Sequence, residues 1–127
     1  MAQFEDVLRR FLFDCERDAN LRDFAREHTI SVHYSITDSK TDFHMLFGDG
    51  VVRAGLGAPP EEADFTLKMD ADTFDGVMSG RLRGMTLAMS GKLKFKGDTM
   101  KGMALQKIGK DLSRLYIQAR AQINDHP

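Results

Sequence analysis

The chain of 127 residues has the length of one domain, enough to bury a core without disulfides, and its one cysteine excludes a disulfide framework and a cysteine-rich zinc site. A net charge of -1 and a pI near 6.4 argue against a nucleic-acid binder, and no stretch approaches the ~20 apolar residues of a membrane span. Acidic residues Glu5 and Asp6 stand where a signal peptide would be positive, and the C-terminus is no peroxisomal address, so we expect a cytoplasmic protein.

The first 15 residues predict an amphipathic helix, because apolar side chains recur at steps of three and four residues. The stripe consists of Phe4, Val7, Leu8, Phe11, Leu12 and Cys15. Because Cys15 lies on this stripe, we expect a buried thiol rather than an activated nucleophile. Asn20 can cap a second helical segment that carries Leu21, Phe24 and Ala25.

Two alternating segments, residues 30–36 and 43–47, predict an antiparallel hairpin around a turn at Asp38 and Ser39. If Thr37 pairs with Lys40, every apolar residue of both strands falls on one face, as burial requires. The predicted pairs are Tyr34 with Phe43, Val32 with Met45, and Ile30 with Phe47.

The same register places His33 opposite His44 on the polar face of the hairpin. Two imidazoles side by side are either a solvated cross-strand pair or two ligands of a metal. Zinc needs three or four ligands, and no third one is visible nearby in the sequence. We therefore predict no metal site and no cofactor.

The middle of the chain predicts two further strands and a short helix. After a turn at Asp49 and Gly50, residues 51–54 form a third strand, and residues 64–69 alternate as a fourth. Asp70 or Asp72 can cap a helix over Phe74, Val77 and Met78, which Gly80 ends. A brief apolar segment over residues 85–89 follows.

Residues 91–97 predict a fifth strand, with Leu93 and Phe95 facing inward and three lysines facing outward. One final helix is predicted over residues 99–122. Its apolar stripe consists of Met100, Met103, Ala104, Ile108, Leu112, Leu115 and Ala119. The chain as a whole, residues 1–127, predicts a single α+β domain: a five-stranded, mostly antiparallel sheet with helices covering one face.

The sequence contains no motif of a phosphate-binding loop, a dinucleotide-binding fold or a nucleophile elbow, and no His-Glu-x-x-His motif of a zinc protease. These absences disfavour an enzyme. Six of the eight methionines lie between Met69 and Met103. Methionine repacks around irregular apolar shapes, so this region suits either a pocket for lipid-like molecules or an ordinary core.

The segment Gly91-Lys92-Leu93-Lys94-Phe95-Lys96-Gly97-Asp98, followed by Met103-Ala104-Leu105-Gln106, resembles the signature of the sterol carrier protein two family. Weaker similarity extends from about Phe4 to Leu115. The resemblance implies a five-stranded sheet, helices on one face and an apolar tunnel between them. It also implies binding of sterols, fatty acids, acyl-CoAs or other lipids, in general without catalysis, and in some bacterial relatives a role in isoprenoid quinone synthesis.

We expect this pocket to be walled by six apolar side chains and one amide. The predicted ligand-binding residues are Phe74, Met78, Met85, Met89, Phe95, Met103 and Gln106. Gln106 lies near the edge of the last helix's stripe, so spacing alone leaves a solvated glutamine as an alternative. The family resemblance favours an amide that faces the tunnel and binds a lipid carbonyl or hydroxyl.

Charge is divided unevenly, with net -6 over residues 1–91 and net +5 over residues 92–127. The basic segment either keeps exposed faces solvated or makes transient contact with anionic membrane lipids.

The expected partner is a lipid or another hydrophobic small molecule, not nucleic acid. The sequence leaves undecided whether the chain forms a homodimer. The alternative function is an accessory or scaffold domain of a lipid-modifying or quinone-synthesis system, with no ligand of its own.

Overall fold

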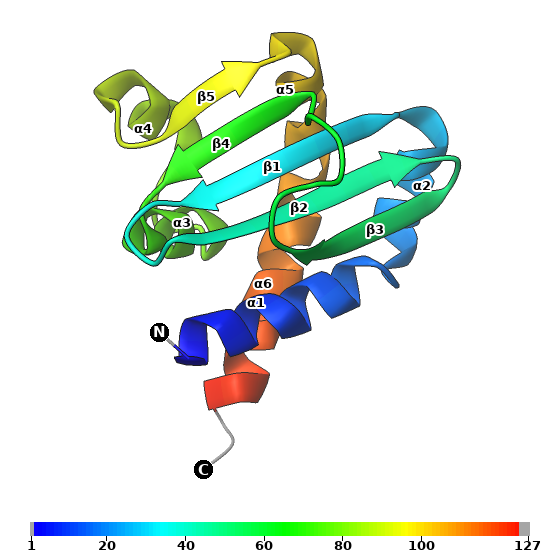
Figure 1. Cartoon of the computed structure of the whole chain (residues 1–127). Helices are drawn as coiled ribbons and strands as arrows, with labels where there is room; N and C mark the ends of the chain where they lie inside the picture. The colour runs from blue at the N-terminus through cyan, green and yellow to red at the C-terminus, as the bar shows by residue number, and fades with distance from the viewer. Residues whose placement is uncertain (1, 125–127) are drawn as a thin grey trace.

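The computed structural model describes residues 2–124, without the side chains of residues 2, 85 and 124. Its N-terminal part runs α1 (Ala2–Cys15), α2 (Ala19–Glu27), β1 (Ile30–Ile36), β2 (Thr41–Gly48) and β3 (Val51–Leu56). There follow β4 (Phe65–Met69), α3 (Ala71–Met78), α4 (Gly84–Ser90), β5 (Lys94–Gly97), α5 (Thr99–Leu105), the 3-10 turn η1 (Gln106–Ile108) and α6 (Gly109–Asn124). The strands form one sheet in the order β3-β2-β1-β4-β5 (Figure 1).

The hairpin register is the one that the sequence predicted. Tyr34 lies opposite Phe43, Val32 opposite Met45, and His33 opposite His44. The inward residues of β1 are buried, and its outward residues are partly exposed. Burial of one face therefore sets the register, since a slip of one residue would expose every one of these side chains.

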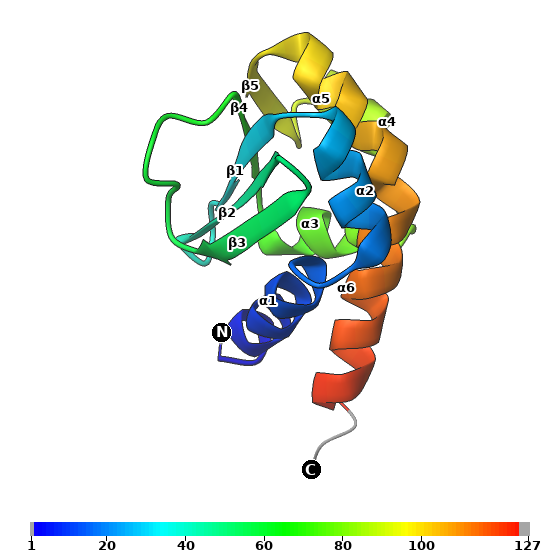
Figure 2. The ribbon, with the colours of Figure 1, turned by 90° about the vertical axis from the view of Figure 1, so that its right-hand side faces the viewer.

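The fold class is confirmed as α+β, with helices on one face of the sheet. The only parallel pair among the described strands is β1 with β4, and the other three pairs are antiparallel. Figure 2 shows the sheet at one side and the helices at the other. The core between the two layers joins the inward strand residues to the apolar stripes of α1 and α6.

Two details of the helices differ from the sequence prediction. Asp18, not Asn20, caps α2, because its carboxylate accepts the backbone N–H of Leu21 at 3.2 Å. The long C-terminal helix is interrupted: α5 ends at Leu105 and α6 begins at Gly109 after the turn η1. α5 contacts β4, while α6 packs on α1.

Candidate functional site

An apolar cavity of about 640 Å³ lies under the β4–β5 end of the sheet, between α3, α4, α5 and α6. Its apolar wall consists of Tyr34, Phe65, Leu67, Met69, Phe74, Val77, Met78, Leu82, Gly84, Ala88, Leu93, Phe95, Gly102, Met103, Leu105, Gly109 and Leu112. Besides the Tyr34 hydroxyl, its polar side chains are Arg83, Thr99, Gln106 and Ser113. Sites for small molecules are commonly of this kind, apolar with a few polar groups.

One wall is α3, which begins where Asp70 accepts the backbone N–H of Thr73 at 2.7 Å. Hydrogen bonds from Thr73 hold the pKa of Asp70 below its ordinary value. From this helix the buried Phe74 makes edge-to-face contacts with the rings of Phe43 and Tyr116, each with centroids 5.4 Å apart. The cap and the aromatic contacts hold this wall against the core.

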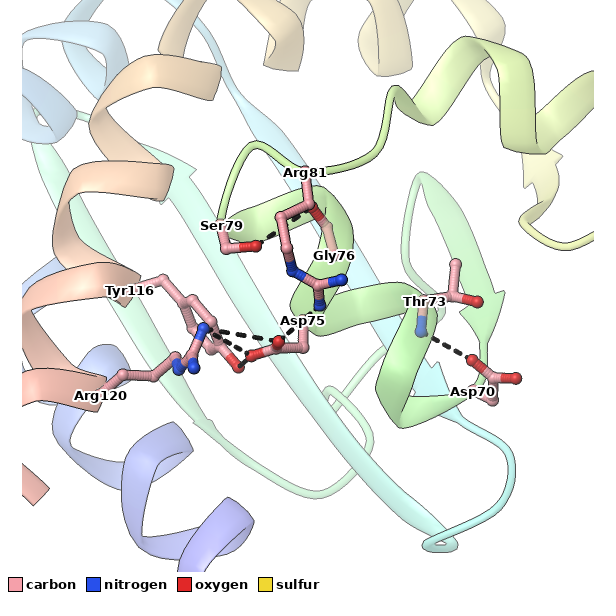
Figure 3. Close-up of polar contacts among 8 residues, drawn as sticks. All are labelled: Asp70, Thr73, Asp75, Gly76, Ser79, Arg81, Tyr116 and Arg120. Atoms are coloured by element: carbon pink, nitrogen blue, oxygen red, sulfur yellow. Dashed lines mark hydrogen bonds and ion pairs between the residues drawn. The ribbon is translucent and has the colours of Figure 1, made fainter. Parts of the chain in front are cut away.

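Asp75 ties α3 to α6 and to the segment that follows α3 (Figure 3). The Tyr116 hydroxyl donates to Asp75 Oδ1 at 2.7 Å, and Arg81 Nη2 lies 2.8 Å from Asp75 Oδ2. Arg120 Nη1 adds a third contact at 3.2 Å from Asp75 Oδ1. Burial, and then the bond to Asp75, raises the pKa of Tyr116, so this hydroxyl stays protonated as the donor. We name these four residues the Asp75 clamp.

Two glycines allow close packing at the cavity edge. A Cβ at Gly76 would collide with Leu82, whose backbone N–H donates to the Gly76 carbonyl at 2.9 Å. A Cβ at Gly102 would collide with the ring of Phe95. Phe95 in turn stacks on Phe65, with ring centroids 5.1 Å apart. Contacts with neighbouring residues therefore position both side chains: Leu82 extends from an irregular segment, and Phe95 extends from the short strand β5.

The structure brings five of the seven predicted site residues to this cavity: Phe74, Met78, Phe95, Met103 and Gln106. The side chain of Met85 lies outside the described residues. Met89 does not line the cavity, and its side chain is 86% exposed. Met89 was predicted as a wall residue, but on α4 it is Ala88 that lines the cavity and Leu87 that is buried. Because each residue of a helix is rotated from the one before it, Met89 points away from the sides that carry Leu87 and Ala88.

The cavity is open rather than fully enclosed. Met103 is 62% exposed and Phe95 38% exposed, although both lie on its wall. Gln106 is also exposed, so its amide lies at the rim of the cavity. Met100, predicted on the inward stripe, is 80% exposed at the start of α5. An enclosed tunnel stays a prediction.

Sequence reasoning missed several wall residues. Tyr34 and Phe65 were predicted as inward strand residues, and their alternation was the signal that placed them under the helices. Leu82 and Arg83 lie in the irregular segment after α3, where no periodicity points inward. Arg83 is the one charged side chain of the described cavity wall.

Outside the cavity, the described groups able to act as a nucleophile, a base or a metal ligand include Cys15, His33 and His44. Burial raises the pKa of the Cys15 thiol, which makes it a poor nucleophile. His33 Nε2 lies 3.4 Å from Asp42 Oδ2, and His44 Nδ1 lies 2.9 Å from the Gly57 carbonyl oxygen. No cluster of three or more metal-ligating side chains occurs within the described residues.

Three of the eight basic residues in the C-terminal part of the chain, residues 92–127, make ion pairs within the protein. Arg114 binds Asp18 at 2.8 Å and Asp111 at 3.2 Å, and Lys101 lies 3.1 Å from Asp64. Arg120 belongs to the Asp75 clamp. Lys92, which precedes β5, and Lys94 and Lys96 on β5 have no ion pair in the described part of the chain. No helix between residues 2 and 124 has both the length and the apolar character to cross a membrane.

The sequence of residues 8–110 matches the model of the SCP-2 sterol transfer family. A fatty acid-binding protein of Yarrowia lipolytica is 38% identical over 66 residues, which cover 52% of this chain and 51% of that protein. The hydroxysteroid dehydrogenase-like protein 2 of Danio rerio is 40% identical over 55 residues, covering 43% of this chain and 13% of that protein. The matches thus span about half of the first relative and a small part of the second.

Solved structures share the fold. The apo form of sterol carrier protein 2 from Yarrowia lipolytica has a TM-score of 0.65 at 24% identity, covering 85% of this chain and 88% of that one. A crystal structure of sterol carrier protein 2 has a TM-score of 0.64 at 21% identity, covering 87% of this chain and 92% of that one. At these identities the likeness shows the fold alone.

Proposed function

The chain belongs to the SCP-2 sterol transfer family, and on that premise we propose that it binds and carries a hydrophobic, lipid-like ligand in the cavity under β4 and β5, without catalysis. The observation that carries the proposal is the cavity itself: about 640 Å³ of space with an apolar wall and a few polar groups. Burial of a lipid chain there contributes roughly 25 cal/mol per Å² of apolar surface before the costs of binding.

A fatty acid is the first ligand to test, since the Yarrowia relative is named as a fatty acid-binding protein. Acyl-CoA, isoprenoid quinone and sterol-like molecules are the other candidates. The methionines and the open rim favour a ligand that the wall can adapt to, over one that needs a rigid complementary shape.

The test is native mass spectrometry of the purified chain, before and after extraction with organic solvent, followed by titration with a fluorescent fatty acid. We expect a co-purified lipid that extraction removes, and saturable binding of the probe at one site. If extraction releases nothing and the probe does not bind, the chain is instead an accessory or scaffold domain with no ligand of its own.

Gln106 is proposed as a contact for the polar head of the ligand, because it lies on the rim of the cavity. Gln106→Leu should change the relative affinities for a fatty acid, its alcohol and its methyl ester by a few-fold, with little effect on stability, since the residue is exposed. Equal affinities of variant and native chain for all three would remove Gln106 from the site.

We further propose a transient contact with anionic membrane surfaces during lipid exchange. This contact is made by Lys92, Lys94 and Lys96, which have no ion pair among the described residues. Each basic residue near an anionic surface contributes about 1 kcal/mol, which suits brief docking. Transfer of the probe between vesicles should be faster with anionic lipid and slower at high salt. Equal rates on neutral and anionic vesicles at low salt would leave these lysines a solvating role only.

A further inference from the structure

The sheet face opposite the helices carries an unfavourable pair of like charges near its β5 edge. Lys68 on β4 lies directly opposite Lys94 on β5, and Thr66 lies opposite Lys96 two residues away on the same face. Like charges directly opposite on neighbouring strands destabilise a sheet. We name Lys68, Lys94 and Lys96 the lysine cluster.

Asp42 on β2 and Asp64, directly before β4, lie close to side chains other than these three lysines. Asp42 Oδ2 lies 3.4 Å from His33 Nε2, and Asp64 Oδ1 lies 3.1 Å from Lys101 Nζ. Across residues 2–124, none of the three lysines makes an ion pair. No negative side chain of the described residues therefore lies within ion-pair distance of the lysine cluster.

The lysine cluster lines a hollow of about 830 Å³ on this face. Its lining residues are His33, Ser35, Thr66, Lys68, Ala88, Gly91, Leu93, Lys94, Phe95 and Lys96. The hydroxyls of Ser35 and Thr66 lie beside the cluster, because Ser35 pairs with Lys68 and Thr66 with Lys96. Hydroxyl and ammonium donors grouped in one concavity match the acceptor oxygens of a phosphate.

Lysines on an edge strand also have a purely structural use, because they discourage pairing with another chain. That use accounts for Lys94 and Lys96, which lie on the edge strand β5. It does not account for Lys68, since β4 lies between β1 and β5 and has no free edge.

We propose that the lysine cluster is a binding site for a phosphate-type oxyanion, which relieves the repulsion between Lys68 and Lys94. Ser35 and Thr66 supply further donors. The hollow shares Ala88, Leu93 and Phe95 with the wall of the apolar cavity. A phosphate that is part of a soluble molecule and a phosphate of a phospholipid surface both offer the chemistry that this site recognises.

The probe for the test is pyrophosphate, compared with sodium chloride at equal ionic strength, by calorimetric titration and thermal unfolding. We expect pyrophosphate to bind and to raise the Tm of the native chain above the chloride reference. Lys68→Gln should weaken pyrophosphate binding about fivefold to tenfold, and it should raise the Tm without pyrophosphate because the repulsion is removed. Lys94→Gln is the second variant, with the same expected pattern.

Lys110→Gln is the matched control, since it removes the same charge from an exposed position on α6. It should leave pyrophosphate binding as in the native chain. Fatty acid probe binding should stay unchanged in all three variants, because none of these lysines lines the apolar cavity. Failure of this site and failure of the proposed lipid cavity are thus measured separately.

The source of the phosphate is resolved by vesicles of phosphatidylcholine with and without phosphatidic acid. Binding to phosphatidic acid vesicles that Lys68→Gln weakens assigns the site to lipid headgroups. Pyrophosphate binding that the variant weakens, with vesicle binding unaffected, assigns it to a soluble phosphate-bearing ligand. If pyrophosphate acts no differently from chloride and both variants bind the vesicles like the native chain, the proposal is overturned. Aggregation of Lys94→Gln alone would then point to edge protection.

Discussion

The two halves of the sheet use their apolar residues differently. In the β1–β2 hairpin, Val32, Phe43 and Met45 have no exposed surface, whereas the β5–α5 region leaves Phe95, Met100 and Met103 in contact with solvent. α2 packs on β2, and α1 and α2 pack on the neighbouring β3, while the β4–β5 end is covered by helices around a cavity. A closed half that supplies stability thus supports an open half with space for a ligand.

The comparison predicts that replacing phenylalanine by alanine lowers the free energy of unfolding more in the closed half than in the open half. Phe43→Ala should lower the free energy of unfolding by about 3–5 kcal/mol, because Phe43 is fully buried and stacks on Tyr34 with centroids 4.5 Å apart. Phe95→Ala should cost less than about 2 kcal/mol, since the ring is half exposed. Urea denaturation measures both, and similar losses would show that the open half is as tightly packed as the hairpin.

Breaking the Asp75 clamp should affect both halves, because it joins the cavity wall α3 to the core helix α6. Asp75→Asn should lower the free energy of unfolding by about 1–3 kcal/mol and weaken fatty acid probe binding. The control is Glu61→Gln, an exposed change of the same kind, which should stay within about 0.5 kcal/mol of the native chain. A stability loss without any change in probe affinity would separate the clamp from the cavity.

Two of the exposed methionines, Met103 and Met89, provide a matched pair of substitutions for the open half. Met103→Trp should fill part of the cavity and weaken probe binding by about tenfold, since Met103 lies on the wall. Met89→Trp makes the same chemical change outside the cavity and should leave the affinity unaltered. Equal effects of the two variants would contradict the position of the cavity.

Two carboxylates near the open half should make the free energy of unfolding fall in acid. Each should contribute less than about 1 kcal/mol after solvent screening. Burial raises the pKa of Asp64, but hydrogen bonds from Ser31 and Lys101 outweigh it, so the pKa lies below the ordinary value of 3.8, as does that of Asp70. A lowered pKa in the folded state means stability that is present above that ordinary value and lost as pH falls through the folded value. The free energy of unfolding, measured from pH 5 to pH 2, should depend less on pH in Asp70→Asn than in the native chain. This variant keeps an oxygen that can cap the helix. An unchanged pH dependence in that variant would exclude Asp70 as a source.

The elements with strict periodicity were predictable, down to the register of the hairpin. Val32, Tyr34 and Phe43 alternate with polar residues, and only one register buries all of them. The positions of Met89 and Met100 were not predictable, because both lie on short helices with no long apolar stripe that would orient them. Leu82 and Arg83 reach the cavity from an irregular segment, where the position depends on packing against Gly76.

The sequence by itself determined the α+β class, the order of most helices and strands, and the inward faces of the strands, since these follow from local spacing and burial. Only the tertiary structure decided the break between α5 and α6, the Asp75 clamp and the open rim of the cavity. Each of these depends on contacts between segments far apart in the chain, such as the 41 residues that separate Asp75 from Tyr116. Local spacing carries no information about such contacts, so the shape of the site appears only when the helices pack on the sheet.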